Sequence, residues 1–185
     1  MLYELGMLKM LHDSIACAFL DRFFVFITWL GNGGMIWILL CIVLLVKPET
    51  RKNGVSMVFA LIIAASATYV LKLAVARPRP FLLDRGIELL ITAPADYSFP
   101  SGHTASSFAA AWTLKEKPKL FIPSFLLASL IAFSRMYLLV HYPSDVAAGM
   151  LIGIFCGQIE IWCGSFALWC IRRYRKQRRK KCINQ

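Results

Sequence analysis

The chain has 185 residues, 58% of them hydrophobic, and a formal net charge of +11. Soluble domains average roughly 45–50% apolar residues, and here the apolar residues form long runs, which excludes an ordinary soluble domain and indicates membrane spans. The charge does not indicate a nucleic-acid partner, because eight of the 21 Lys and Arg residues lie in the tail 172–185, directly after an apolar stretch, where anionic lipid is the natural partner.

Over about 1–13 the apolar residues Leu2, Leu5, Leu8 and Leu11 stand three positions apart, with polar residues between them. This spacing predicts a short amphipathic helix lying at the membrane interface. No small-residue cleavage site follows a short apolar core, so no cleavable signal peptide is expected. The chain shows no repeat and no low-complexity linker, so we expect a single domain over residues 1–185.

The first long apolar region is interrupted at Gly31-Asn32-Gly33-Gly34, which is a strong turn signal. We therefore expect two spans around it, at about 15–30 and 34–47. The first contains Asp21 and Arg22, which are costly at mid-membrane, so a partly inserted helix is the alternative.

Prolines and basic loops delimit the rest of the chain. Pro78 and Pro80 end a helix, since the residue before each proline is pushed out of the α region. Pro143 stands at a favoured first helical position. Four further spans are expected, at about 54–76, 100–115, 120–138 and 143–171. The expected fold is an all-α, polytopic membrane bundle of six transmembrane helices with a short interfacial N-terminal helix.

Charge orients this bundle. The loops 47–53 and 115–119 hold three Lys or Arg residues each, and the C-terminal tail holds eight. By the positive-inside rule these segments are cytoplasmic, and with six spans both termini lie on that side. The loop 77–99 and the turn 138–143 then lie together on the extracytoplasmic side of a cell membrane.

The last predicted helix carries Gly149, Gly153 and Gly157 at four-residue spacing. Small residues at this spacing let another helix approach closely. We expect packing inside the monomer, with a dimer face as the alternative.

Polar residues are scarce in the spans, yet several gather at the ends that this topology brings together. They are Lys72, Arg79, Ser101, His103, Ser134, Arg135, His141 and Asp145. Taken singly, each has a simpler explanation: Lys72 would extend to the interface, His103 would be part of a helix start, and Arg135 would pair with Asp145.

Taken together, the same residues indicate phosphoryl chemistry. Lys72, Arg79 and Arg135 form a cage of cations suited to a dianionic phosphoryl group, and a helix N-terminus at Gly102 adds free N–H groups. Asp145 can hold one imidazole nitrogen of His141 and leave the other as a nucleophile. His103 can then give a proton to the leaving oxygen.

These residues form three motifs, KLAVARPRP at 72–80, PSGH at 100–103 and SRMYLLVHYPSD at 134–145. The set resembles the type 2 phosphatidic acid phosphatase (PAP2) family, whose pattern is K-x6-RP, PSGH and SR-x5-H-x3-D. Every motif position matches in the family's order, and the resemblance covers about residues 54–165.

The resemblance implies a membrane phosphatase that acts on lipid phosphates or diphosphates without a metal ion or other cofactor. His141 is then the nucleophile, Asp145 its orienting partner, and His103 the general acid and later the base. The implied phosphate-binding residues are Lys72, Arg79, Ser101, Gly102 and Arg135. Arg77 is outside the motif and, on our hypothesis, extends the positively charged entrance of the site toward a second phosphate.

The expected partners are the bilayer and a membrane lipid phosphate, with no nucleic acid. Among lipids we favour undecaprenyl diphosphate, because an outward-facing site fits a carrier released as diphosphate on that side. Phosphatidylglycerol phosphate, phosphatidic acid and a lipid A phosphate are the alternatives. The family's vanadate-dependent haloperoxidase branch shares the motifs but is soluble, so the spans argue against it. A non-enzyme alternative is an inactive membrane scaffold with the same fold.

Overall fold

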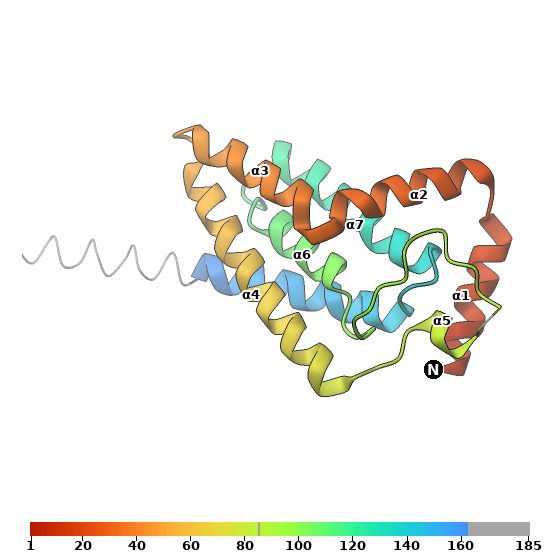
Figure 1. Cartoon of the computed structure of the whole chain (residues 1–185). Coiled ribbons are helices and arrows are strands. Elements are labelled where there is room, and N and C mark those ends of the chain that lie inside the picture. Colours follow the sequence, from red (N-terminus) through yellow and green to blue (C-terminus); the bar gives the residue numbers. More distant parts are fainter. Residues whose placement is uncertain (85, 163–185) are drawn as a thin grey trace, which may run out of the picture.

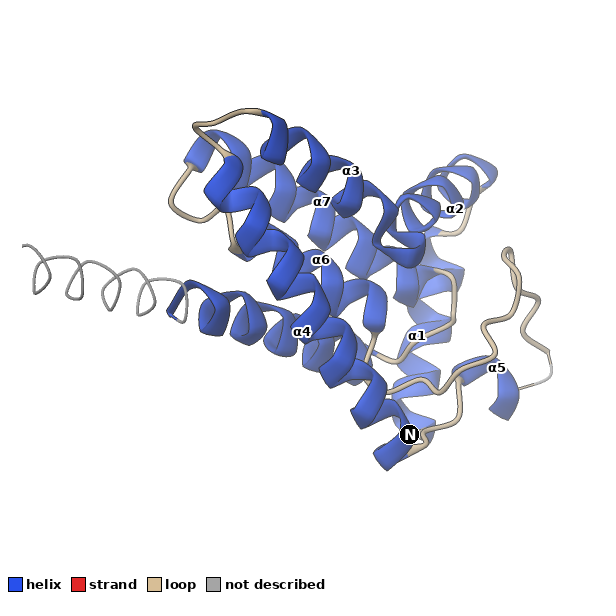
Figure 2. Cartoon of the chain, turned by 60° about the vertical axis from the view of Figure 1, so that its left-hand side comes forward, coloured by secondary structure: helices blue, strands red, loops and turns tan. Residues whose placement is uncertain are grey.

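The protein is described here by a computed structural model that covers residues 1–84 and 86–162. These residues form helices and loops without a strand (Figure 2). The basic tail 172–185 and the end of the last predicted helix lie outside the described residues. Figure 1 shows a bundle of long helices with a short helix standing across one end.

The helices follow one another in chain order with their bounds as follows. They are α1 (Leu2–Ile15), α2 (Ala18–Gly31), the short 3₁₀ helix η1 (Asn32–Gly34), α3 (Met35–Val46), α4 (Arg51–Val75), α5 (Pro80–Leu83), α6 (Gly102–Trp112), α7 (Pro118–Tyr137) and a last helix, Pro143–Trp162. The expected all-helical membrane bundle is confirmed in outline, since four of its segments are long and apolar enough to cross a membrane: Ala18–Val46, Arg51–Leu83, Pro118–Tyr137 and Pro143–Trp162.

The glycine-rich segment bends the first apolar region but does not reverse it. Gly33 and Gly34 adopt left-handed φ values of 57° and 72°, and Figure 1 shows α3 continuing away from α2 toward the start of α4. At 1.5 Å per residue α2 and α3 are about 21 and 18 Å long, and a bilayer core is about 30 Å thick. The two helices therefore form one kinked span of 29 residues, and the expected count of six spans is not confirmed.

Because the chain does not reverse at Gly31–Gly34, the N-terminal helix α1 lies at the opposite end of the bundle from the end expected. In α1, Lys9 pairs with Asp84 at 2.6 Å and Glu4 pairs with Arg77 at 3.0 Å, so α1 contacts the segment after α4. The basic loops lie together at the opposite end, where Lys117 Nζ donates to the Glu49 carbonyl at 2.8 Å. The expectation that the N-terminus lies beside the basic loops was wrong for this structure, because it assumed a chain reversal at Gly31–Gly34.

Helix α6 occupies the centre of the bundle. Phe108 and the alanines that follow it are fully or almost fully buried, and the last helix crosses α6 through its glycines. A Cβ at Gly149 would lie 2.7 Å from the Ser101 carbonyl oxygen, and one at Gly157 would lie 3.0 Å from that of Ala109. The glycine spacing therefore serves close packing inside the monomer, which fixes the start of the last helix against the start of α6.

Candidate active site

The motif residues meet at the end of the bundle away from the basic loops. They surround a cavity of 630 Å³, whose lining includes Lys72, Arg79, Gly102, His103, Arg135 and His141. The end of α4, the loop 76–101, the start of α6, the end of α7 and the turn 138–142 each contribute to it. Six of the eight predicted site residues thus face one cavity, while Ser101 and Asp145 lie behind its wall, fully buried.

His141 is placed by a tight turn after α7. Leu139 adopts a φ of 57°, a region that residues with a Cβ rarely occupy. The backbone then folds back, so that the N–H groups of Val140 and His141 both donate to the Arg135 carbonyl, at 3.2 and 3.3 Å. The result is an imidazole that is almost fully buried yet borders the cavity.

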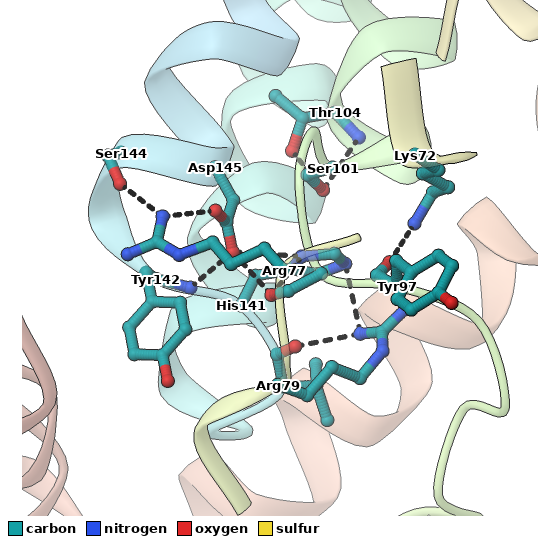
Figure 3. A network of polar contacts seen from close by, with 12 residues as sticks. Lys72, Arg77, Arg79, Tyr97, Ser101, Thr104, His141, Tyr142, Ser144 and Asp145 are labelled. Atoms are coloured by element: carbon teal, nitrogen blue, oxygen red, sulfur yellow. Dashed lines mark hydrogen bonds and ion pairs between the residues drawn. The ribbon is translucent and has the colours of Figure 1, made fainter. Parts of the chain in front are cut away.

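Asp145 holds the inner nitrogen of that imidazole. His141 Nδ1 lies 3.5 Å from Asp145 Oδ2, and the same oxygen accepts from Ser98 Oγ at 2.5 Å and from the Tyr142 N–H at 2.9 Å. These contacts, drawn in part in Figure 3, fix the carboxylate on the Nδ1 side of the ring. Nε2 remains on the opposite side, 3.3 Å from Arg79 Nη1.

The charge state of His141 suits a nucleophile. Burial and the nearby guanidinium groups of Arg135 and Arg79 outweigh the opposing effect of Asp145 and lower the pKa of His141 to about 3. The imidazole is therefore neutral at ordinary pH. A neutral ring whose Nδ1–H donates to Asp145 has a free lone pair on Nε2.

Two buried arginines and a lysine supply positive charge. Arg79 and Arg135 are both 2% exposed. Arg79 Nη1 donates to the Val140 carbonyl at 2.7 Å, and Arg135 Nη1 donates to Thr28 Oγ1 at 2.5 Å. The Nε of Arg135 has no hydrogen-bond partner among the described residues. Burying such a donor is costly unless an acceptor arrives, so this arrangement is suited to an anionic ligand.

Asp96 joins two of these cations. Its Oδ2 lies 2.9 Å from Lys72 Nζ, and its Oδ1 lies 2.5 Å from Arg79 Nη2. Burial alone would raise the pKa of Asp96, but the hydrogen bond and charge of Lys72 and the charge of Arg79 lower it to about 2. The side chain is 57% exposed, so an ionised carboxylate sits in the cavity between the two residues expected to bind phosphate.

The start of α6 borders the cavity through two residues. A Cβ at Gly102 would meet nothing within 4 Å, so the glycine leaves space beside the helix N-terminus. His103 Nε2 lies 2.9 Å from Asn32 Oδ1 of η1. Ser101 instead caps the helix, because its Oγ accepts from the Thr104 N–H at 3.5 Å, and it also accepts from Thr104 Oγ1 at 2.9 Å. Its side chain therefore stabilises the motif from behind the cavity wall.

Sequence reasoning missed several of these residues. Asp96 and Ser98 stand in the PADYS segment at 94–98, one residue before PSGH, and a carboxylate beside a phosphate-binding motif is a signal that could have been used. Thr28 and Asn32 come from the first apolar region, which the motifs do not reach. Arg77 does not line the 630 Å³ cavity, so its expected reach toward a second phosphate has no support; it contacts Asp145 instead.

Comparisons with known proteins identify relatives of the chain. Residues 53–176 match the PAP2 superfamily model. An undecaprenyl-diphosphatase of Sulfolobus acidocaldarius is 38% identical over 138 residues, which are 74% of this chain and 66% of that protein, just under two thirds of its length. The undecaprenyl-diphosphatase BcrC of Bacillus subtilis is 32% identical over 151 residues, which are 79% of this chain and 74% of that protein.

A solved structure has a fold similar to that of this chain. The crystal structure of Aquifex aeolicus LpxE superposes with a TM-score of 0.75 and 34% identity, and the match covers 85% of this chain and 93% of that one. Residues 53–176, which match the PAP2 superfamily model, include all three motifs on which the resemblance in the sequence rests. The chain therefore belongs to the PAP2 superfamily and is one of its multi-pass membrane phosphatases.

Proposed function

We propose that this protein hydrolyses a membrane lipid diphosphate, most specifically undecaprenyl diphosphate, through a phosphohistidine on His141 and without a metal ion. The observation that carries the proposal is the neutral His141 whose Nε2 borders a cavity lined by Lys72, Arg79 and Arg135. A nucleophile without charge and a phosphoryl group held by fixed cations are what phosphoryl transfer requires.

The reaction proceeds in two displacements. His141 Nε2 attacks the terminal phosphorus, and the bond from phosphorus to the bridging oxygen breaks. His103 takes up a proton when the bound diphosphate offsets the charge of the nearby arginines, and it gives that proton to the bridging oxygen. Water then attacks the phosphohistidine, His103 takes the proton of the water, and the phosphorus–nitrogen bond breaks. Inorganic phosphate and free His141 are released, and each bond broken is matched by one formed.

Fixed cations supply most of the stabilisation. Lys72, Arg79 and Arg135 face the equatorial oxygens, whose negative charge they balance without reorganisation. Asp145 balances the positive charge that His141 acquires as it is phosphorylated. Asp96 leaves its place between Lys72 and Arg79 when the phosphate arrives, because the two anions compete for the same donors.

The site opens on the extracytoplasmic face in this proposal. The loops next to Lys47 and Lys117 are basic and lie at the end opposite the cavity, so the positive-inside rule puts the cavity outside. Because α1 lies at the cavity end, the N-terminus is extracytoplasmic as well, in contrast to the expectation from six spans. The chain then crosses the membrane five times. Four crossings are the long apolar segments, with α2 and α3 as one, and the fifth is the shorter α6, which is buried at the centre of the bundle.

An apolar groove supports the proposal that the substrate is a lipid with one long chain. Between α3 and α4 lies a groove of 430 Å³ with no polar lining, formed by Ile38, Cys41, Ile42, Leu45, Val58, Leu61, Ile62 and Ala65. A second groove of 410 Å³ shares Ile38, Leu61 and Ala65 with it and continues to Lys72 and His103. A polyprenyl chain in this path has its diphosphate beside the cations and its tail in the bilayer.

The experiment compares substrates in detergent with EDTA present. Phosphate release is measured from undecaprenyl diphosphate, phosphatidylglycerol phosphate and phosphatidic acid, with His141→Ala as the control. The proposal expects the highest kcat/KM for undecaprenyl diphosphate and no release by the variant. A higher kcat/KM for another lipid contradicts the proposed substrate, whereas dependence on added metal, or activity in His141→Ala, contradicts the proposed mechanism.

A further inference from the structure

Arg77 contacts the buried carboxylate of the active site from the side away from the cavity. Its Nη1 lies 2.6 Å from Asp145 Oδ1 and 2.7 Å from Ser144 Oγ, and its guanidinium carbon lies 4.0 Å from the centre of the Tyr142 ring. Figure 3 shows the guanidinium group of Arg77 between Ser144 and Asp145 and linked to both. The two oxygens of the carboxylate thus have separate partners, Oδ1 with Arg77 and Oδ2 with His141.

The pairing of Asp145 with Arg77 as well as with His141 has an electrostatic reason. Asp145 is 0% exposed, and a buried carboxylate needs a cation close by. His141 is neutral at ordinary pH, so it does not supply that charge before the reaction begins. Among the described residues, Arg77 is the permanently charged group that pairs with Asp145. Its planar donors also fix the rotation of the carboxylate.

Arg77 is held in turn by the N-terminal helix. Arg77 Nη2 lies 3.0 Å from Glu4 Oε1 of α1. The other oxygen of Glu4 accepts from Ser144 Oγ at 2.6 Å and from the Ser144 N–H at 3.2 Å. Burial of Glu4 is outweighed by these hydrogen bonds and by Arg77, so the pKa of Glu4 is lowered and the side chain is ionised. Glu4 therefore binds both Arg77 and the first turn of the last helix, which carries Asp145.

We infer that Arg77 is a positioning residue that orients Asp145 toward His141, and that α1 holds Arg77 in place through Glu4. The inference rests on the proposed function and deepens it, because it adds a chain of contacts from α1 to the nucleophile. Arg77 does not touch the substrate phosphate in this arrangement. Its loss lowers the rate of phosphoryl transfer and leaves substrate binding nearly unchanged.

The test separates kcat from KM in a set of purified variants. Partners that orient a reacting group typically contribute about 10–100-fold, so Arg77→Gln should lower kcat by about that factor with little change in KM. Arg77→Lys should restore part of the loss because it keeps the charge. Glu4→Gln should lower kcat less. The double variant Glu4→Gln/Arg77→Gln should lose less than the two single losses multiplied together, since Glu4 acts in part through Arg77.

The matched control is Lys9→Gln. It removes the other ion pair of α1, with Asp84, but leaves Glu4 and Arg77 untouched, so kcat should stay at the wild-type value. Unchanged kcat in Arg77→Gln and Arg77→Lys, a rise in KM alone, or equal losses in Glu4→Gln and Lys9→Gln would each overturn the inference. Failure of the proposed function is distinct, because it shows as wild-type protein without lipid phosphatase activity or as activity in His141→Ala.

Discussion

The carboxylate of Asp96 lies 2.9 Å from the ammonium group of Lys72, inside the cavity and in contact with Arg79 as well. A phosphate that binds both cations must displace this carboxylate. Asp96 is therefore an internal anion that stabilises the cations, and the affinity for phosphate is the difference between two competing sets of charged hydrogen bonds.

Asp96→Asn should strengthen the binding of inorganic phosphate. The amide keeps the shape of the side chain but loses the charge, so the competing interaction weakens by about 1.5 kcal/mol, which corresponds to roughly tenfold in the inhibition constant. Inhibition of lipid hydrolysis by phosphate measures this effect. Glu88→Gln is the control, because it makes the same change of charge at an exposed position in the same loop. Equal or weaker inhibition of Asp96→Asn would show that Asp96 aligns the cations instead.

Folding stability should depend on the titration of His141. Its pKa is about 3 in the folded protein, against an ordinary value of 6.5, so below pH 6.5 the unfolded state binds more protons than the folded state. Stability is then complete above about pH 6.5 and falls as the pH decreases toward 3. Thermal unfolding in detergent at several pH values measures this.

The matched variant is His141→Asn, which lacks the titrating ring. Its Tm should fall less than that of the wild type between pH 6.5 and pH 4.5, because the other histidines are present in both proteins. Parallel curves for the two proteins would mean that the pKa of His141 is the same in the folded and unfolded states, and the argument that burial keeps the ring neutral would fail.

Packing of the last helix on α6 should tolerate no side chain at Gly153. A Cβ there would lie 2.9 Å from the Ala109 backbone nitrogen, and overpacking of this kind typically costs about 1–3 kcal/mol. Gly153→Val should therefore lower the Tm and reduce activity, since Asp145 lies on the same helix. Gly6→Val, where a Cβ would meet nothing within 4 Å, shows how much a similar change costs at an open position. Similar Tm values for the two variants would contradict the packing argument.

The groove between α3 and α4 should determine the preference for chain length. Ala65 lines both the apolar groove and the second groove that continues to Lys72, so Ala65→Trp should lower kcat/KM for undecaprenyl diphosphate while hydrolysis of a short-chain prenyl diphosphate stays the same. Ser66→Trp is the matched control, one position along α4 and exposed but outside the groove lining. An equal decrease for both chain lengths, or in both variants, would place the lipid tail elsewhere.

Much of this organisation is predictable from the sequence because hydrophobic runs and prolines are local signals. The positions of α4, α6 and α7 follow from apolar stretches that end at polar or proline-rich segments. Phosphoryl chemistry follows from residue types at fixed spacing. His103, Arg135 and His141 were expected at one site and do line one cavity.

Other features depend on geometry that spacing does not reveal. A run of glycines indicates a break in a helix, but whether Gly33 and Gly34 bend the chain or reverse it depends on how α2 and α3 pack against their neighbours. That difference decides the end at which α1 lies. The contacts of Arg77 with Glu4 and Asp145 join residues 73 and 68 positions apart in the sequence, so no local pattern distinguished them from a phosphate contact.

The measurement that tests the central claim most directly is to find the phosphoryl group on the enzyme. The protein is mixed with undecaprenyl diphosphate labelled with ³²P in the terminal phosphate, quenched in alkali during turnover, and digested. We expect alkali-stable, acid-labile label on the peptide that contains His141, and none in His141→Ala. Rapid hydrolysis by the wild type with no label, or with label on another residue, would contradict a phosphohistidine mechanism at His141.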